Sequence, residues 1–208
     1  MIWVLFTLGT LTALLVAEKA GASAFVRLAK PLASAGFLAY ALYEGALQSP
    51  YGHAVFVGLV FSWFGDVFLL SKRPAWFLAG LVAFFIAHVA YIGAFATFHP
   101  AWSSVALTTA GLAVVAGFVR SWLRPNLPEG MKRPVDLYIM VITLMVATAV
   151  AAWRAGAPTM MLAGAFAFYL SDLSVARERF VAPGFVNRLW GLPAYYIAQL
   201  MLGSTCGG

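Results

Sequence analysis

Long apolar runs separated by short polar breaks fill almost all of the 208 residues of this chain. A helix needs about 20 mainly apolar residues, within a range of roughly 17–25, to cross the hydrocarbon core of a bilayer. The runs have this length, and the breaks contain the proline, glycine and charged residues that end helices. The pattern predicts eight transmembrane helices, at residues 1–17, 31–47, 52–70, 75–98, 101–119, 135–153, 157–175 and 189–204.

Six prolines help to set the predicted helix starts. A proline costs least in the first turn of a helix, where its missing N–H would have no partner. These prolines fall at or near the starts of apolar runs: Pro31, Pro50, Pro74, Pro100, Pro134 and Pro158. The loops are short, so consecutive helices should pack as antiparallel hairpins. The first run, Met1–Ala17, lacks a basic N-terminal segment and a convincing cleavage site, so we interpret it as a retained helix rather than a signal peptide.

The composition also indicates a membrane protein. Hydrophobic residues make up 63% of the chain and charged residues only 10%, whereas soluble domains contain about 25% charged residues. No polar stretch is long enough to separate two domains. We therefore expect a single all-α domain over residues 1–208, a polytopic membrane helix bundle whose surface faces lipid.

Lysine and arginine are distributed unevenly between alternate loops. Of the 13 basic residues, 12 lie in or beside the odd-numbered loops, and only Arg154 lies in an even-numbered one. Positive residues are retained on the cytoplasmic side of a membrane. The odd loops should therefore be cytoplasmic and both termini should lie on the outer face, as expected for a bacterial inner-membrane protein. The net charge of +6 then reflects membrane orientation, and with no nucleic-acid-binding motif we expect no nucleic-acid partner.

Two aspartates lie inside apolar runs. A charge within the bilayer costs roughly 2.5–3.5 kcal/mol on insertion scales, and four glutamates avoid this cost in loops, while Asp136 opens the predicted sixth helix as an N-terminal cap. Asp66 and Asp172 instead lie within the third and seventh helices, which run in the same direction, and each follows a small residue, Gly65 or Ser171. At 1.5 Å per residue, both should lie about 8–9 Å from the cytoplasmic helix end.

Two carboxyls at the same depth suit acid/base chemistry. If they face each other in a low dielectric, both cannot ionise easily, so one should keep its proton. A proton donor then lies beside a proton acceptor, which is the pairing that acid/base hydrolysis requires. The alternative is a pair of structural carboxyls bonded to backbone, lysine or arginine. The two aspartates also lie in similar segments, Phe64-Gly65-Asp66-Val67 and Leu170-Ser171-Asp172-Leu173, which is either a four-plus-four repeat or a coincidence.

Other polar residues could reach the same level. Lys30 begins the predicted second helix, where it either reaches the aspartates or a phosphate, or extends along the interface. His88 lies near the middle of the fourth helix with Tyr91 one turn on, as a cavity residue or a packing residue. Tyr138 lies near the cytoplasmic start of the sixth helix, where an interfacial aromatic is the simpler interpretation.

The last helix contributes three further candidates, Tyr195, Tyr196 and Gln199. Aromatic packing could explain the tyrosines, but Gln199 needs a partner in a lipid environment. With a single histidine at depth, a zinc site is not expected, and there is no serine-hydrolase elbow, so we expect no cofactor. The only cysteine, Cys206, should be an inert thiol.

At these residues the chain resembles the lysoplasmalogenases, the YhhN-type integral membrane proteins. The matching segments are Lys30-Pro31, Phe61-Ser62-x-x-Gly65-Asp66, Ala87-His88-x-x-Tyr91, Gly164-Ala165-x-x-Phe168-x-x-Ser171-Asp172 and Tyr195-Tyr196-x-Ala198-Gln199. The resemblance implies an eight-helix fold and hydrolysis of the vinyl ether bond of lysoplasmalogens, a class of lysophospholipid, to a fatty aldehyde and a glycerophospho-alcohol. It also implies that Asp66 and Asp172 are the catalytic pair. In such an enzyme we expect the lipid tail to lie in the apolar bundle, with its headgroup toward the basic cytoplasmic rim.

Two other classes remain open from the sequence. Intramembrane carboxylates also relay protons in transporters, and a structural membrane scaffold would need no site at all. A transporter should carry charged groups on both sides of the midplane, whereas the two buried acids here lie on one side, which favours an enzyme reached from one leaflet. The pattern leaves the oligomeric state open.

Overall fold

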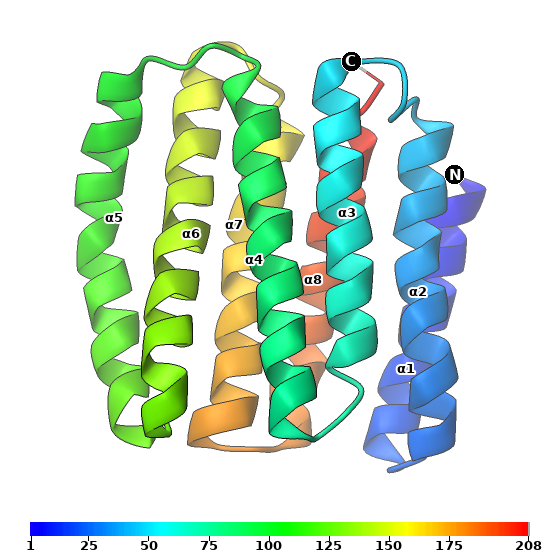
Figure 1. Cartoon of the computed structure of the whole chain (residues 1–208). Helices are drawn as coiled ribbons and strands as arrows, with labels where there is room; N and C mark the ends of the chain where they lie inside the picture. Colours follow the sequence, from blue (N-terminus) through cyan, green and yellow to red (C-terminus); the bar gives the residue numbers. More distant parts are fainter. Residues whose placement is uncertain (208) are drawn as a thin grey trace.

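The computed structural model describes residues 1–207, and over these residues the chain folds into eight long helices without strands, as the apolar pattern predicts (Figure 1). The helices are α1 (Ile2–Lys19), α2 (Ser23–Tyr43), α3 (Pro50–Phe68), α4 (Pro74–Ala96), α5 (Trp102–Leu123), α6 (Glu129–Arg154), α7 (Thr159–Ala176) and α8 (Phe185–Ser204). A 3-10 turn, η1 (Arg124–Asn126), follows α5, and a π-helical turn, η2 (Arg177–Val181), extends α7.

Local sequence explains several helix ends. The side chain of Ser49 accepts a hydrogen bond of 3.0 Å from the backbone N–H of Gly52, and Pro50 follows it as the first residue of α3. Pro74 is likewise the first residue of α4. Gly156 follows the C-cap residue of α6, Ala155, and adopts a φ of 101°, a left-handed conformation that glycine takes without strain.

Three helices begin earlier than the apolar runs predicted. α2 begins at Ser23, α6 at Glu129 and α8 at Phe185, so Pro31 and Pro134 lie inside helices rather than at their starts, and the predicted positions of these two prolines are wrong. The early turns carry charged residues that face the interior or extend beyond the apolar part of the bundle. An apolar-run criterion cannot detect such turns, because it ends a helix where the polarity rises.

The same early start corrects the role of Asp136. This residue lies two turns into α6 and accepts a hydrogen bond of 2.8 Å from Arg120 Nε on α5, with Arg124 Nη2 at 3.9 Å. The predicted N-terminal cap is therefore wrong, and Asp136 instead joins α5 to α6.

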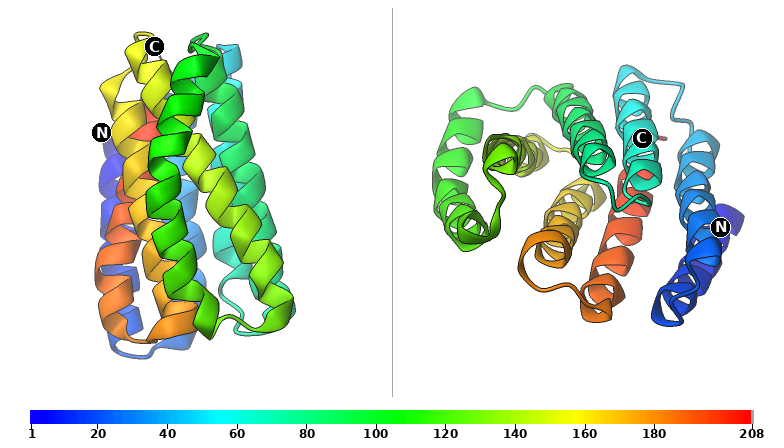
Figure 2. Two further views of the ribbon diagram at one scale, coloured as in Figure 1. Left: turned by 90° about the vertical axis from the view of Figure 1, so that its left-hand side faces the viewer. Right: turned by 60° about the horizontal axis from the view of Figure 1, so that its bottom comes forward.

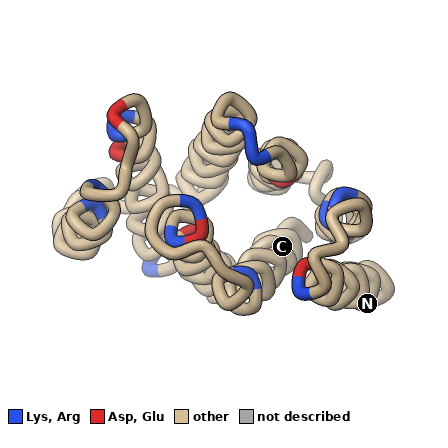
Figure 3. The backbone as a smooth tube through the Cα atoms, turned by 90° about the horizontal axis from the view of Figure 1, so that it is seen from below, with Lys and Arg blue, Asp and Glu red and all other residues tan. Residues whose placement is uncertain are grey.

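The helices form two layers (Figures 1 and 2). α2, α3, α4, α6 and α5 form one row, and α1, α8 and α7 lie behind it. Consecutive helices pack against each other as predicted, except that α4 packs on α6 rather than on α5. α2 also packs on α8. Both termini lie at the end opposite to the loops 20–22, 69–73, 124–128 and 182–184. Most lysines and arginines gather near these loops, at what we call the basic end (Figure 3).

The outer surface suits a lipid environment. Six helices are long and apolar enough to cross a membrane: α1, α3, α4, α5, α6 and α7. Large apolar side chains cover the outside, such as Leu107, Val114 and Phe118 on α5, which are all more than 70% exposed. α2 and α8 are of similar length, with 21 and 20 residues, and bury polar residues inside the same bundle. The chain is therefore a multi-pass integral membrane protein.

Small residues allow α3 and α4 to approach closely. A Cβ atom at Gly58 would lie 2.4 Å from the ring of Tyr91, and one at Gly65 would lie 2.5 Å from the ring of Phe84. Phe84 cannot move aside easily, because its ring packs edge to face on Phe168 and Tyr195, with centroids 6.1 and 5.9 Å away.

We predict that Gly65→Ala lowers the stability of the bundle by about 1–3 kcal/mol, the usual cost of overpacking. The matched control is Gly93→Ala on α4, where an added Cβ meets nothing within 4 Å. Thermal unfolding of purified protein in detergent would measure the difference. An equal melting temperature for the two variants would contradict the close packing described for Gly65.

The membrane orientation can be tested by cysteine labelling, because the native thiol of Cys206 should not react with the label. Cys206 is buried, and burial raises the pKa of its thiol to about 12, so it should not react with a maleimide near neutral pH. In bacterial cells that express the protein, an impermeant maleimide should label Gln48→Cys, in the α2–α3 loop, without permeabilisation. Gly130→Cys, at the basic end, should be labelled only after permeabilisation, and the reverse pattern would invert the proposed topology.

Candidate active site

A cavity of about 680 Å³ lies inside the bundle and reaches both Asp66, which is buried, and Asp172, which is partly buried. Its lining includes Gly21, Lys72 and Pro183, which belong to loops at the basic end, so the cavity opens there. The other half of the bundle is filled by large buried side chains, among them Tyr91, Phe95, Met161 and Leu202. The site is therefore a pocket entered from one end.

Asp66 lies at the inner end of this cavity, held by donors from two other helices. Its Oδ2 accepts hydrogen bonds of 2.6 Å from both Ser34 on α2 and Tyr195 on α8. Its Oδ1 lies 3.2 Å from the ammonium of Lys30 on α2, in an ion pair whose side chains are 13% and 3% exposed. Hydrogen bonds to a charged group are stronger than neutral ones, and all three donors suit an ionised carboxylate.

A second group of contacts fixes these donors. The hydroxyl of Tyr196 donates to the carbonyl of Lys30 at 3.2 Å and lies 3.1 Å from Ser34 Oγ. Trp63 donates its indole N–H to the carbonyl of Pro31 at 3.2 Å. These contacts join α2 to Tyr196 on α8 and to Trp63 on α3. α2 is thereby held in place beside Asp66.

Asp172 has a different set of partners. Tyr138 on α6 donates a hydrogen bond of 2.7 Å to Asp172 Oδ2. The Nε2 atom of His88 on α4 lies 3.0 Å from the Tyr138 hydroxyl and 3.5 Å from the same carboxylate oxygen. The side chain of Asp172 is 16% exposed and lines the cavity, and the hydrogen bonds of the described residues leave its Oδ1 without a partner. One oxygen of Asp172 is therefore free to meet a ligand.

The two carboxyls share the cavity without contacting each other directly. Asp66 accepts hydrogen bonds from Ser34 and Tyr195, and Asp172 accepts one from Tyr138, so the two carboxyls have no hydrogen-bond donor in common. The rings of Phe84, Phe168 and Tyr195 pack edge to face beside them, with centroids 5.5–6.1 Å apart. A ligand in the cavity could lie between the two groups, which an aspartate pair sharing one proton would not allow.

Several of the residues predicted to bind substrate lie behind the cavity wall. Tyr91 donates a hydrogen bond of 2.8 Å to Gln199 Oε1, and both are fully buried outside the lining, as are His88 and Tyr196. Lys30, Tyr138, Ser171 and Tyr195 line the cavity itself. The buried Nδ1 of His88 and Nε2 of Gln199 have no hydrogen-bond partner among the described residues. Each of these two atoms could therefore form one more hydrogen bond.

Sequence reasoning missed Ser34, although it contacts Asp66 directly. It lies four residues after Lys30 and therefore on the same face of α2, which is the signal that could have found it. Within residues 1–207, no group of three or more histidine, cysteine, aspartate or glutamate side chains is arranged to hold a metal ion.

The two carboxyl environments are related by a four-helix shift. Asp66 on α3 is bonded to α2 and α8, and Asp172 on α7 is bonded to α6 and α4. Advancing every helix by four places converts one set into the other. The packing repeats in the same way, with α1 on α2 and α5 on α6, α3 on α4 and α7 on α8, and α2 on α8 and α6 on α4. The surroundings of the two carboxyls agree with an internal repeat, but the repeat is incomplete, because α1 packs on α8 whereas α5 has no comparable contact with α4.

Known proteins resemble this chain over most of its length. Lysoplasmalogenase TMEM86A of Bos taurus is 32% identical over 169 residues, which cover 75% of this chain and 66% of the bovine protein. The human protein of that name is 34% identical over 163 residues, again 75% of this chain and 66% of the relative. A lysoplasmalogenase of Mycobacterium tuberculosis is 33% identical over 135 residues, 57% of this chain and 50% of the relative.

The chain spans about two thirds of the length of these mammalian relatives. No solved structure matches it. The sequence profile of the YhhN family matches residues 25–206, which extend from the first turn of α2 to beyond the end of α8 and include both aspartates. This chain belongs to the YhhN family.

Proposed function

We propose that this chain is a membrane hydrolase that cleaves the vinyl ether bond of lysoplasmalogen-type lysophospholipids. Relatives that share about a third of their aligned residues with it are named lysoplasmalogenases. The observation that carries the proposal is the pair of carboxyls at one cavity, one of them held by an ammonium and the other with an oxygen free toward a ligand. The surrounding lipid would deliver the substrate, and no cofactor is required.

The reaction needs one proton donor and one carboxylate. Protonation of the β-carbon of the vinyl ether converts the double bond into an oxocarbenium ion. Water adds to that ion and loses a proton, giving a hemiacetal, which collapses to a fatty aldehyde and the free hydroxyl of the glycerol. The proton released balances the proton supplied, so the enzyme returns to its starting state. Paired carboxylates handle a similar cation in glycosidases.

Asp172 fits the role of the proton donor. Its near partners are a tyrosine hydroxyl and a histidine ring, and no lysine or arginine of the described residues forms an ion pair with it. A carboxyl without a permanent counterion in a low dielectric is best placed to hold a proton. Its unpaired Oδ1 lies at the cavity, where a transferred proton is needed. Tyr138 and His88 act as positioning residues that orient this carboxyl.

Asp66 fits the role of the ionised carboxylate. Lys30 balances its charge, and the hydroxyls of Ser34 and Tyr195 both donate to it. A fixed negative charge can stabilise the oxocarbenium ion and then orient or deprotonate the attacking water. Because these donors are already held in place by their own contacts, few groups need to move when the oxocarbenium ion forms.

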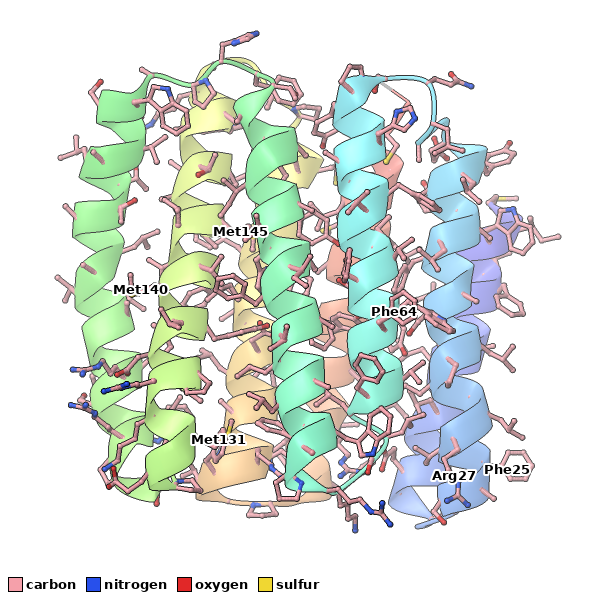
Figure 4. The ribbon with its side chains drawn as sticks, in the orientation of Figure 1. Phe25, Arg27, Phe64, Met131, Met140 and Met145 are labelled. Atoms are coloured by element: carbon pink, nitrogen blue, oxygen red, sulfur yellow. The ribbon has the colours of Figure 1, made fainter. Side chains whose placement is uncertain are left out.

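A transporter fits the cavity less well. Alternating access needs a path toward both faces of the membrane. Here the half of the bundle away from the basic end is packed with buried side chains, including Met145 (Figure 4). A pocket that opens at one end suits an enzyme that takes a lipid from one leaflet.

We predict that Asp66→Asn and Asp172→Asn each reduce turnover of lysoplasmalogen by about 10²-fold or more, the usual loss for a positioned acid or base. Asparagine keeps the size of the side chain, so the protein should still fold. Aldehyde release by purified protein in detergent or vesicles would measure turnover. Asp136→Asn, outside the cavity, is the control and should keep most of the activity.

The double variant Asp66→Asn/Asp172→Asn should be little worse than either single variant, because residues that act as one unit are not additive. Wild-type turnover by either single variant would refute the two-aspartate mechanism. Hydrolysis of an ester-linked lysolipid in preference to the vinyl ether would refute the proposed substrate class.

We further predict that Lys30→Met lowers the stability of the fold, because it leaves the Asp66 carboxylate buried without a counterion. Breaking a buried pair from one side costs roughly 3–5 kcal/mol. Combining Lys30→Met with Asp66→Asn should recover part of this loss, since no uncompensated charge remains. The control is Lys132→Met, which removes an exposed ion pair with Glu129 and should change little.

Thermal unfolding of the wild type, Lys30→Met, Lys30→Met/Asp66→Asn and Lys132→Met in the same detergent would test this prediction. If Lys30→Met unfolded at the same temperature as Lys132→Met, the carboxyl of Asp66 would not depend on Lys30, and its assignment as the ionised group would fail.

A further inference from the structure

The charged residues at the mouth of the cavity fall into two groups. In the first group, Arg188 forms ion pairs with Glu18 and with Glu178, the latter at 3.1 Å. Glu178 also accepts hydrogen bonds of 2.7 Å from the backbone N–H of Gly184 and 2.8 Å from Asn187. These contacts join α1, η2 and the start of α8, so the first group is occupied in holding the mouth together.

The second group consists of three cations that line the cavity with no carboxylate partner among the described residues: Arg27, Lys72 and Arg179. The guanidinium of Arg179 lies over the ring of Phe77, 4.6 Å from its centroid, and donates to the carbonyl of Lys72 at 3.4 Å. These two residues are thus neighbours on one side of the mouth. Arg27 lies near the basic end of α2 (Figure 4).

Arg27 is connected to the buried aspartate through the face of α2. Arg27, Lys30 and Ser34 follow one another at helical spacing, so they form one polar stripe that leads inward. Lys30 and Ser34 both contact Asp66. An anion bound at Arg27 would therefore lie about one helical turn, roughly 5 Å, from the Lys30–Asp66 pair.

The opposite wall of the cavity is apolar. It is formed by residues of α5 and α6: Val119, Leu123, Val135, Ile139 and Ile142. A molecule with a negative group at one end and a hydrocarbon chain at the other would match both walls at once. In a lysoplasmalogen, five bonds separate the phosphorus from the vinyl ether oxygen, a length of the order of the helical turn between Arg27 and Lys30, about 5 Å.

We propose that Arg27, Lys72 and Arg179 bind the phosphate of the substrate headgroup, and that the hydrocarbon chain lies along the α5–α6 wall. This assignment rests on the proposed function, which it extends from the reacting bond to the recognition of the phosphate. Arginine and lysine bind phosphate through charge-assisted hydrogen bonds. The arrangement sets the vinyl ether between Asp66 and Asp172 when the phosphate is at the mouth.

The kinetic test compares two substrates with the same alkenyl chain, a lysoplasmalogen and the corresponding alkenylglycerol, which lacks the phosphate. For wild type, kcat/KM should be higher for the lysoplasmalogen. Arg27→Gln and Lys72→Gln should each lower kcat/KM for the lysoplasmalogen roughly tenfold, the equivalent of one lost charged contact, and leave that for alkenylglycerol unchanged. Arg133→Gln is the matched control, since Arg133 is an exposed cation of the basic end outside the cavity lining.

A binding test separates this proposal from the proposed function. The probe is an alkyl-ether lysophospholipid, whose saturated ether cannot be cleaved in this way. It should raise the melting temperature of the wild type and of Arg133→Gln, and raise that of Arg27→Gln and Lys72→Gln much less. This result would support the phosphate site even if no vinyl ether were hydrolysed.

Three results would overturn the proposal. The first is an equal loss of kcat/KM for both substrates in Arg27→Gln and Lys72→Gln, which would indicate a structural role. The second is equal stabilisation of all variants by the alkyl-ether probe. The third is stabilisation of the wild type by inorganic phosphate as large as that by the lipid, which would indicate a general anion site rather than a headgroup site.

Discussion

The ion pair between Lys30 and Asp66 is the contact on which the arrangement of the bundle interior depends. The hydrocarbon core of the bilayer contains no water to solvate a charge, so the partner of a charged side chain must come from the protein. Lys30 comes from α2, Asp66 from α3, and the supporting hydroxyls of Ser34 and Tyr195 from α2 and α8. Satisfying this one group therefore fixes three helices relative to one another. The aromatic residues around Tyr195 then set the wall that continues toward Asp172.

Much of the fold could be predicted from the sequence, because lipid imposes a length on every apolar run. The number and order of the helices follow from that constraint, and the loops rich in Lys and Arg do lie at one end of the bundle. What failed were the first turns of α2 and α6, where charged residues continue a helix beyond its apolar part. Asp136 was misassigned for this reason, since a cap can be recognised only if the helix start is known.

Both aspartates line one cavity, as their expected common level suggested, but their distance from the helix end was not predicted correctly. α3 ends at Phe68, only two residues after Asp66, so Asp66 lies about 3 Å from that end rather than about 8–9 Å. The surroundings of the two aspartates could not be predicted either. Rise per residue places two side chains at one level, whereas their partners depend on which faces of distant helices meet. The bond between Tyr138 and Asp172 joins residues 34 positions apart, and that between Tyr195 and Asp66 joins residues 129 positions apart. Ser34 carried no chemical signal of its own beyond its spacing from Lys30. Apolar periodicity is weak in a helix that is apolar all round, so the facing side cannot be read from the sequence.

The four-helix shift that relates the two halves has a consequence for how such a site can arise. A unit with an even number of helices ends on the side of the membrane where it began, so two copies joined in tandem insert in the same orientation. Two identical copies would surround both carboxyls alike, and neither could be committed to giving a proton while the other stayed charged. The different roles that we propose for Asp66 and Asp172 therefore depend on their neighbours, which are lysine, serine and tyrosine around Asp66 and tyrosine and histidine around Asp172. In this architecture the two carboxyls can stay the same while their neighbours diverge.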